Sequence, residues 1–160
     1  MMFRVGFGFD VHRLVAGREL WLGGVRVPHE VGALGHSDAD VLLHAVCDAL
    51  LGAVAMGDIG RHFPDTDARW KGADSKLLLK EVVRMLAEQG WRVGNVDSTL
   101  VLERPKIMPH VPAMRTVMAE LLQVNEDAVS IKATTNETMG FVGRKEGVVA
   151  HAVAMVLRTP

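Results

Sequence analysis

The spacing of apolar residues near the start of the chain predicts strands. Residues 3–11 place an apolar side chain, mostly phenylalanine or valine, at every second position, which is the period of a strand. Residues 19–28 contain two short apolar runs around Gly23 and Gly24, a pattern typical of a hairpin. The polar, glycine-containing stretch from Gly32 to Ser37 indicates a loop.

Three later stretches have the apolar period of a helix. We expect the first helix to begin at Ser37, whose hydroxyl is a good N-cap, and to continue to Met56. The other two are predicted over residues 74–89 and 109–122. Between the first two helices lies a long loop, residues 57–73. A loop of that length inside a compact domain is usually functional.

Three more strands complete the prediction, over residues 92–103, 128–134 and 147–157, the last of them after a loop through Gly140 and Gly143. The last strand is apolar on both faces, so both faces need a cover. Helices can cover one face, and a neighbouring subunit is a natural cover for the other. The chain has no repeat and no linker, so we expect one α/β domain spanning residues 1–160.

Composition narrows the classes of protein. A net charge of −1 with scattered signs gives no support for a nucleic-acid or anionic-membrane surface. No apolar run reaches the ~18 residues of a membrane helix, and the N-terminus has no signal-peptide layout. The single cysteine, Cys47, suits a reducing compartment and lies in an apolar helical stretch, which predicts a buried side chain. We therefore expect a cytoplasmic protein. Its aliphatic excess, 49% apolar residues with no tyrosine, favours an oligomer.

Asp10 and His12 are the first candidates for chemistry. Residues two apart on a strand point to the same face, so a carboxylate and an imidazole lie side by side. A simple hydrogen bond between them is the alternative. His44, in the predicted helix, would add a third ligand from a separate element and leave one tetrahedral position open, as in catalytic zinc sites. A buried histidine with a structural role is the alternative there.

The residues before His44 allow several interpretations. His36, Asp40 and His44 follow one another at a spacing of four, so the three can share a helix face. Asp40 could orient the ligand His44, face solvent, or cap the helix. We favour solvent exposure or capping. Ser37 at a helix start suits an anion as well as a cap, and His36 can donate to a phosphate oxygen.

A further polar cluster, Lys132 to Glu137, ends the strand predicted at 128–134. Consecutive hydroxyls suit phosphate hydrogen bonding, and the Glu137 carboxylate suits Mg²⁺ or Mn²⁺. On composition alone the same residues also fit an ordinary strand end followed by a helical turn.

Five segments together resemble the cyclodiphosphate synthases, in that family's order and over essentially the whole chain. They are Gly8-Phe9-Asp10-Val11-His12; His36-Ser37-Asp38-Ala39-Asp40 with His44; Gly57-Asp58-Ile59-Gly60 with Phe63-Pro64-Asp65-Thr66-Asp67; Pro105-Lys106; and Lys132-Ala133-Thr134-Thr135 through Gly143-Arg144.

The resemblance implies a fold and a set of ligands. The expected fold is a four-stranded mixed sheet backed by helices, with three subunits packing their sheets around a threefold axis and active sites between neighbours. Asp10, His12 and His44 match ligands of one Zn²⁺ per subunit, and Glu137 matches the ligand of a second ion, Mg²⁺ or Mn²⁺. His36 and Thr135 match stabilisers of the transition state.

The resemblance also implies a substrate. It is 4-diphosphocytidyl-2-C-methyl-D-erythritol 2-phosphate, whose 2-phosphate attacks the β-phosphorus and expels CMP. Residues matching its contacts are Asp10, His12, His36, Ser37, Asp58, Ile59, Gly60, Phe63, Pro64, Asp65, Thr66, Asp67, Leu102, Lys106, Ile107, Met108, Ala133, Thr134, Thr135, Asn136 and Glu137. The cytidine contacts match Leu102 through Met108 and Ala133 through Thr135, largely through the backbone, and the 61–73 loop is expected to exclude water.

Some positions depart from the family pattern. Residues 102–104 and 107–108 look locally variable, and His62 stands where a leucine or similar residue is expected. Some members hold an isoprenoid diphosphate in the axial cavity, near residues matching Phe141 and Arg144. His151 stands at a position of the last strand where related proteins can carry an acidic residue near the threefold axis, which changes the expected charge of that cavity, while Arg144 is retained.

Two other functions use the same residues. A metal-dependent phosphohydrolase would use a metal tripod of Asp10, His12 and His44 to activate water. A non-catalytic trimer that binds isoprenoid diphosphates would not need Asp10 or Glu137.

Overall fold

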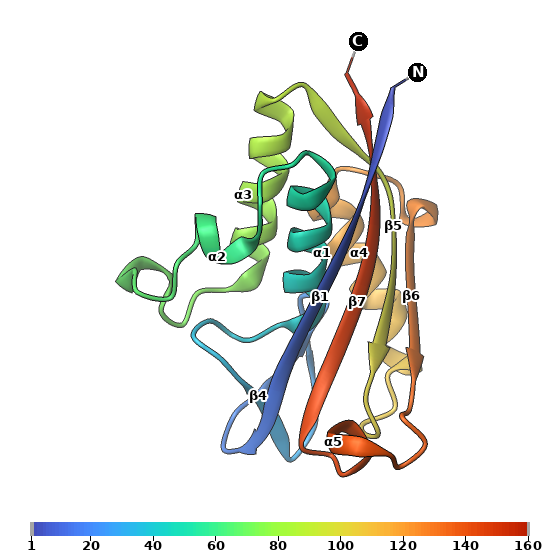
Figure 1. The fold of residues 1–160 in the computed structure, drawn as a ribbon. Helices are drawn as coiled ribbons and strands as arrows, with labels where there is room; N and C mark the ends of the chain where they lie inside the picture. The colour runs from blue at the N-terminus through green and yellow to red at the C-terminus, as the bar shows by residue number, and fades with distance from the viewer. Residues whose placement is uncertain (1, 160) are drawn as a thin grey trace.

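A computed structural model of the protein describes residues 2–159, which form one mixed sheet backed by helices (Figure 1). The strands are β1 (Phe3–Ala16), β2 (Leu20–Leu22), β3 (Val25–Val27), β4 (Val31–Leu34), β5 (Trp91–Val101), β6 (Val129–Thr134) and β7 (Gly147–Arg158). The helices are α1 (Val41–Ala53), α2 (Ile59–His62), α3 (Ser75–Glu88), α4 (Val111–Leu122) and α5 (Gly140–Gly143). Short 3₁₀ turns are η1 (Ala68–Trp70), η2 (Met108–His110) and η3 (Glu126–Ala128).

The main sheet has five strands in the order β4-β1-β7-β5-β6, and β2 and β3 form a separate hairpin. In the main sheet, as residues 2–159 form it, β5 and β6 pair in parallel, whereas β1–β4, β1–β7 and β5–β7 are antiparallel. The mixed sheet and the hairpin are confirmed, but the expected number of four strands in the sheet is wrong. The extra strand is β4, which pairs with the end of β1 in the segment that its polar and glycine residues suggested was a loop.

Helices α1, α3 and α4 lie together on one side of the sheet, and α1 runs along β1 and β7 (Figure 1). Two glycines of β1 make this close approach possible. A Cβ added at Gly6 would stand 1.9 Å from the Ala49 carbonyl oxygen, and one at Gly8 would stand 1.8 Å from that of Ala45. The phenylalanines of β1 therefore point away from α1, and the glycines between them carry the helix contact.

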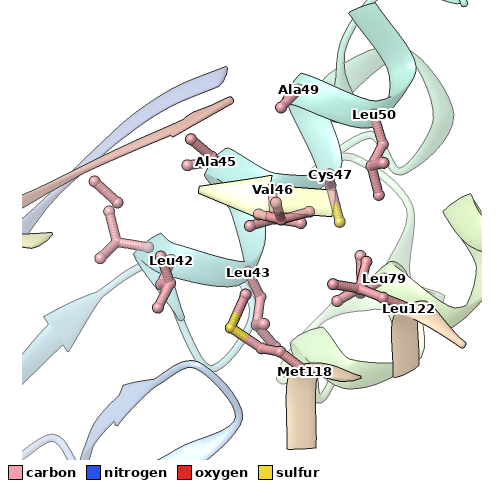
Figure 2. Close-up of a cluster of buried hydrophobic side chains, with 14 of the residues drawn as sticks. Leu42, Leu43, Ala45, Val46, Cys47, Ala49, Leu50, Leu79, Met118 and Leu122 are labelled. Atoms are coloured by element: carbon pink, nitrogen blue, oxygen red, sulfur yellow. The ribbon is translucent and has the colours of Figure 1, made fainter. Parts of the chain in front are cut away.

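The core lies between α1 and the elements around it. Figure 2 shows Leu43, Met118, Leu79 and Leu122 meeting below α1, and each of these side chains is at least 99% buried. Cys47 lies within the same cluster and is buried, as predicted. Since α1 is buried nearly all round, its position relative to β1 is fixed by packing on several sides.

The start of α1 differs from the prediction. The helix begins at Val41, and its N-cap is Asp40, not Ser37. Asp40 is fully buried, so the solvent-facing interpretation is wrong and the capping one is confirmed. Its carboxylate accepts the N–H groups of Leu42 and Leu43 in the helix and those of Gly23 and Gly24 in the β2–β3 turn. Because four backbone N–H groups donate to the Asp40 carboxylate, Asp40 is a more stable N-cap for α1 than Ser37 would be, although serine is also a favoured N-cap residue.

Most of the remaining boundaries lie close to those predicted, but β1 continues to Ala16, well beyond the predicted end at residue 11. The 57–73 segment contains two short helices, α2 and η1, so it is a structured connection. The helix predicted at 109–122 divides into η2 and α4, and the residues before β7 form the single turn α5. In the segment 2–159, no helix has both the length and the apolar composition that crossing a bilayer would require.

The face of the sheet opposite the helices is apolar and open within the chain. Phe3, Val5, Phe7, Phe9 and Val11 of β1 are 42–62% exposed. On the neighbouring β7, Val153 is 43% exposed and His151 packs against the rings of Phe7 and Phe9. The expectation that β7 is apolar on both faces is thus confirmed, and helices cover one of the two.

Candidate metal centre and nucleotide cleft

Asp10, His12 and His44 meet between β1 and α1. Asp10 and His12 project from the helix side of β1, two residues apart. His44 projects from the first turns of α1, which the close approach at Gly8 brings onto β1. The Asp40 cap fixes where that helix begins and therefore which residue faces Asp10. The structure brings together all three residues that the sequence predicted as a tripod.

The three ligand atoms form a small triangle. Asp10 Oδ2 lies 3.0 Å from His12 Nε2 and 3.0 Å from His44 Nδ1, and the two nitrogens are 3.2 Å apart. Two ligands about 2.1 Å from a tetrahedral ion stand roughly 3.4 Å from each other. A shift of a few tenths of an ångström would therefore fit a tetrahedral divalent ion, and one carboxylate with two imidazoles is a suitable donor set.

Charge and burial also favour a cation here. Burial of Asp10 opposes its ionisation, but hydrogen bonds from His12 and His44 outweigh it and hold the pKa of the carboxyl well below its usual range. Burial of His44 likewise disfavours its charged form, yet the hydrogen bond and charge of Asp10 raise the pKa of the imidazole. An ionised carboxylate with two partly buried imidazoles is an anionic ligand set when both rings are neutral.

Each imidazole uses its second nitrogen for a hydrogen bond. His12 Nδ1 lies 3.0 Å from the Leu34 carbonyl oxygen of β4. His44 Nε2 lies 2.9 Å from Ser75 Oγ at the start of α3 and 3.2 Å from Ser37 Oγ. A metal-binding histidine usually donates through its other nitrogen in this way.

The loop between β4 and α1 carries His36 and Ser37. His36 is exposed and precedes α1, so it does not share a helix face with Asp40 and His44 as the spacing suggested. Ser37 is buried, and its hydroxyl accepts the Ala39 N–H, which is an internal role. Because Asp40 occupies the helix start, the predicted anion site at Ser37 lacks the helix N-terminus that motivated it. A hollow of about 510 Å³ borders this loop and includes His36 and Lys71.

A cleft of about 460 Å³ lies at the β6 edge of the sheet, between β6 and the segment after β5. It is lined by Leu102, Glu103, Arg104, Pro105, Lys106, Ile107, Met108, Ala133, Thr134, Thr135, Thr138 and Lys145. All the residues of this region that the resemblance matched to cytidine contacts thus border one cavity. Three cationic side chains, Arg104, Lys106 and Lys145, line the cleft beside one carboxylate, Glu103, so the lining has a positive net charge.

Glu137 lies on an exposed turn beside this cleft. Both Glu137 and Thr138 have left-handed backbone conformations, with φ of 51° and 62°. The turn is held by Glu103, whose Oε1 accepts the N–H groups of Asn136 and Thr138. The Thr135 hydroxyl donates to Glu137 Oε1 at 3.1 Å, so the two predicted functional residues are in contact.

The segment 57–73 contributes a third group of predicted residues. Asp58 caps α2, and the Ile59 N–H donates to Asp48 of α1 at 2.7 Å. Phe63 is the buried residue of the segment and packs edge-on against Trp70, with ring centroids 5.0 Å apart. His62, whose role the sequence left open, bonds the Met56 carbonyl oxygen through Nε2. Asp65 and Thr66 are exposed, and Asp67 pairs with Arg69.

The metal tripod and the cleft are separated within the chain. His12 pairs with Val148 on β7, and Thr134 pairs with Val101 on β5, so the two lie at nearly the same level of the sheet. Strands β1 and β6 are separated by three inter-strand spacings, which together measure roughly 14 Å. The tripod and Glu137 therefore do not form one compact two-metal site within a single chain.

Two functional candidates escaped sequence reasoning. Ser75 directly follows Asp74, the N-cap of α3, and Asp38 lies in the loop before α1, so neither has a local sequence pattern that indicates its role. Arg18 also holds the loop, because its guanidinium donates to the carbonyl oxygens of Ala33, Gly35 and Ser37. A polar residue next to a predicted cap can be assigned a role only once its spatial partner is known.

Comparison with known proteins gives consistent matches over nearly the whole chain. Residues 3–157 match the YgbB family. A protein of Azotobacter vinelandii named 2-C-methyl-D-erythritol 2,4-cyclodiphosphate synthase is 60% identical over 154 residues, 96% of this chain and 98% of that protein. A protein of the same name from Dechloromonas aromatica is 61% identical over 158 residues, 99% of each chain.

Solved structures give the same result. The CDP-bound form of 2C-methyl-D-erythritol-2,4-cyclodiphosphate synthase has a TM-score of 0.89 and is 40% identical, covering 96% of this chain and 100% of that one. The bifunctional IspDF from Campylobacter jejuni has a TM-score of 0.94 and is 39% identical. The match covers 98% of this chain and 42% of the Campylobacter jejuni chain.

Proposed function

The chain belongs to the YgbB family, and from that premise we propose that it converts 4-diphosphocytidyl-2-C-methyl-D-erythritol 2-phosphate to 2-C-methyl-D-erythritol 2,4-cyclodiphosphate with release of CMP. It would act as one domain spanning residues 1–160, in the supply of isoprenoid precursors. The observation that carries the proposal is the convergence of Asp10, His12 and His44 within 3.2 Å of one another.

Repulsion between phosphoryl groups is the main barrier to this reaction. Two unit charges ~4 Å apart at an effective dielectric of ~20 cost about 4 kcal/mol, and nearly dianionic groups cost several times more before screening. The attacking 2-phosphate is already an anion, so no general base is needed. Positive charge placed around the two reacting groups therefore matters more than proton transfer.

We propose that Asp10, His12 and His44 hold zinc and that Glu137 holds Mg²⁺ or Mn²⁺. When bound, these ions supply charge neutralisation and a template for the phosphate oxygens. Three protein ligands would leave the ion able to accept an oxygen of the substrate. Glu137, on the turn beside the cleft, would hold its ion close to the diphosphate of a nucleotide whose base occupies that cleft.

The protein's own cations and loops would complete the site. Lys106, Arg104 and Lys145 border the cleft and favour an anionic ligand. His36 and Thr135 are proposed to donate to phosphate oxygens, and both are exposed in the chain described here. Asp58, Ile59 and Gly60 are proposed to contact the methylerythritol part. The residues that follow, Phe63 to Asp67, are proposed to exclude water, since hydrolysis is the competing reaction.

We also propose a homotrimer with active sites between neighbours. The open apolar face of β1 and β7 supports burial against other copies. The roughly 14 Å across the sheet between tripod and cleft supports a site completed by two chains.

An isoprenoid diphosphate near Phe141 and Arg144 stays a prediction. It would compete with the ion pair that Arg144 forms with Glu146 at 2.9 Å. The cytoplasmic location likewise stays a prediction.

Incubation with the phosphorylated CDP substrate, Zn²⁺ and Mg²⁺ tests the function directly. We expect ³¹P spectra to show a cyclic diphosphate and CMP in equal amounts. Linear phosphates or inorganic phosphate would instead identify a phosphohydrolase. Absence of turnover, with isoprenoid diphosphate binding that survives replacement of Asp10, would identify a binding protein.

A further inference from the structure

The two nitrogens of the His44 ring face different partners. Nδ1 points at Asp10 and His12, while Nε2 lies 2.9 Å from Ser75 Oγ. A neutral imidazole carries a proton on one nitrogen and a lone pair on the other. If Nδ1 gives its lone pair to a metal, the proton sits on Nε2, and that N–H needs an acceptor.

Ser75 can serve as that acceptor because its own proton is engaged elsewhere. Its hydroxyl donates to Asp38 Oδ1, and its backbone N–H donates to Asp38 Oδ2 at 3.0 Å. The Ser75 side chain is fully buried, so bulk water does not compete for these bonds. An ionised carboxylate only accepts, and this fixes the direction of every bond from His44 through Ser75 to Asp38.

We propose that Ser75 and Asp38 are positioning residues of the metal centre. They form a hydrogen-bond chain, Asp38–Ser75–His44, that would hold the His44 ring with its proton on Nε2 and leave the Nδ1 lone pair for an ion shared with Asp10. The inference rests on the zinc assignment proposed above and extends it to two residues outside the tripod.

His12 shows the same arrangement with a backbone partner. Its Nδ1 lies 3.0 Å from the Leu34 carbonyl oxygen, an acceptor that no substitution at position 34 removes. His44 depends instead on side chains from two other segments. Ser37 Oγ is a weaker alternative, since it lies 3.2 Å from Nε2 and already accepts the Ala39 N–H.

The hydrogen-bond chain Asp38–Ser75–His44 also connects the metal centre to the contact between two loops. The Asp38 N–H donates to the Ala73 carbonyl oxygen at 3.0 Å, and the Gly72 N–H donates to that of His36 at 2.7 Å. The segment before α3 is thereby fastened to the loop that carries His36. The orientation of His44 should therefore depend on whether these two segments are in contact.

Zinc affinity of the full-length protein tests the proposal without reference to turnover. Ser75→Ala removes the acceptor, and we expect the zinc Kd, measured by competition with a chromophoric chelator, to rise about 10–100-fold. Asp38→Asn keeps the shape but removes the charge that orients the hydroxyl, and a rise of roughly three- to tenfold is expected. With Co²⁺ in place of zinc, Ser75→Ala should also change the visible ligand-field bands.

Ser98→Ala is the matched control. Ser98 is a buried serine of β5, 2% exposed, whose hydroxyl donates to the Ser130 carbonyl oxygen away from the tripod. Its loss removes one buried hydroxyl hydrogen bond and should leave the zinc Kd within about twofold, since Ser98 bonds none of the three proposed ligands. An unchanged zinc Kd in both Ser75→Ala and Asp38→Asn would overturn the proposal, as would an equal loss in Ser98→Ala. If Ser75→Ala does not fold, Asp38→Asn decides the matter alone.

The outcome is separable from that of the proposed function. A wild-type protein that binds zinc but forms no cyclic product contradicts the proposed reaction only. A wild-type protein that cyclises the substrate, with variants of unchanged zinc affinity, contradicts only the role of Ser75 and Asp38.

Discussion

Gly8 of β1 lies directly beneath the carbonyl oxygen of Ala45 in α1, so close that a methyl group at Gly8 would stand 1.8 Å from that oxygen. The contact sits between the two parts of the metal tripod, with Asp10 two residues further along β1 and His44 next to Ala45. The distance between strand and helix at this glycine therefore sets the size of the triangle that the ligand atoms form.

Gly8→Ala should disturb both stability and metal binding. The added methyl group overlaps backbone atoms, which cannot rotate away, so we expect a loss of about 3 kcal/mol or more in the free energy of unfolding. For a chain of this size that lowers the melting temperature by roughly 6–12 °C. Zinc affinity should fall as well, because α1 is displaced from Asp10.

Gly52→Ala in the same helix is the control. The nearest atom to its added Cβ is the Phe7 carbonyl oxygen at 3.9 Å, an ordinary contact distance. Alanine is the better helix former, so this variant should be more stable by about 0.5–1 kcal/mol with unchanged zinc affinity. Calorimetry of both variants checks the pair. Equal melting temperatures would contradict the role assigned to Gly8.

Asp40 should contribute more to folding than an ordinary helix cap. Asp40→Ala leaves the N–H groups of Gly23, Gly24, Leu42 and Leu43 without their acceptor, and we expect a loss of about 3–5 kcal/mol. Asp40→Asn keeps Oδ1 for three of these donors but turns an NH₂ group toward Gly24, so its loss should be intermediate. Guanidinium denaturation measures both. An asparagine variant less stable than the alanine one would contradict this account.

The sequence predicted the tripod because its ligands follow local rules. Asp10 and His12 share a strand face by period, and His44 is a polar exception on an apolar helix. The long strands and the three long helices followed from the same periodicity, whereas the short elements α2 and α5 lie in segments predicted as loops. The start of α1 did not, because Ser37 and Asp40 both have capping side chains and only the distant Gly23-Gly24 turn decides between them.

Strand β4 and the roles of Ser75 and Asp38 depend on pairing partners far away in sequence. Residues 31–34 have no strand pattern of their own and become a strand by pairing with the end of β1. Ser75 meets Asp38 across 37 residues of sequence. Such partners are set by packing of the whole chain, so no local pattern contains them.

Glu137→Gln should separate the two proposed ions. The amide keeps the size of the side chain but binds Mg²⁺ and Mn²⁺ weakly, because both ions prefer carboxylate oxygens. We expect turnover to require at least about tenfold more Mg²⁺, while zinc content, read by mass spectrometry, stays at the wild-type level. Glu88→Gln, on the exposed side of α3, should change neither quantity. Loss of zinc together with Mg²⁺ dependence in Glu137→Gln would contradict the two-ion proposal.

Cys47 should be unreactive in the folded protein. Its side chain is fully buried within α1, and burial raises the pKa of the thiol well above its usual range, so little thiolate forms at pH 8. Labelling with a disulfide reagent at that pH should be at least about 100-fold slower than in guanidinium, since it requires opening of the core. Complete labelling within seconds under native conditions would show that α1 is not held as described.

Phe7→Asp should break the proposed assembly while leaving the chain folded. The Phe7 side chain is 62% exposed on the open face of the sheet, so aspartate is tolerated in one chain but would be buried without a partner between copies. We expect sedimentation to show three chains for the wild-type protein and one for the variant. Cyclisation should be lost, because tripod and cleft would come from different chains, whereas zinc should stay bound. Leu77→Asp is the control, since Leu77 is 58% exposed but lies on α3, on the other side of the sheet. A wild-type protein that sediments as one chain, or a Leu77→Asp variant that dissociates equally, would rule out this face as the interface.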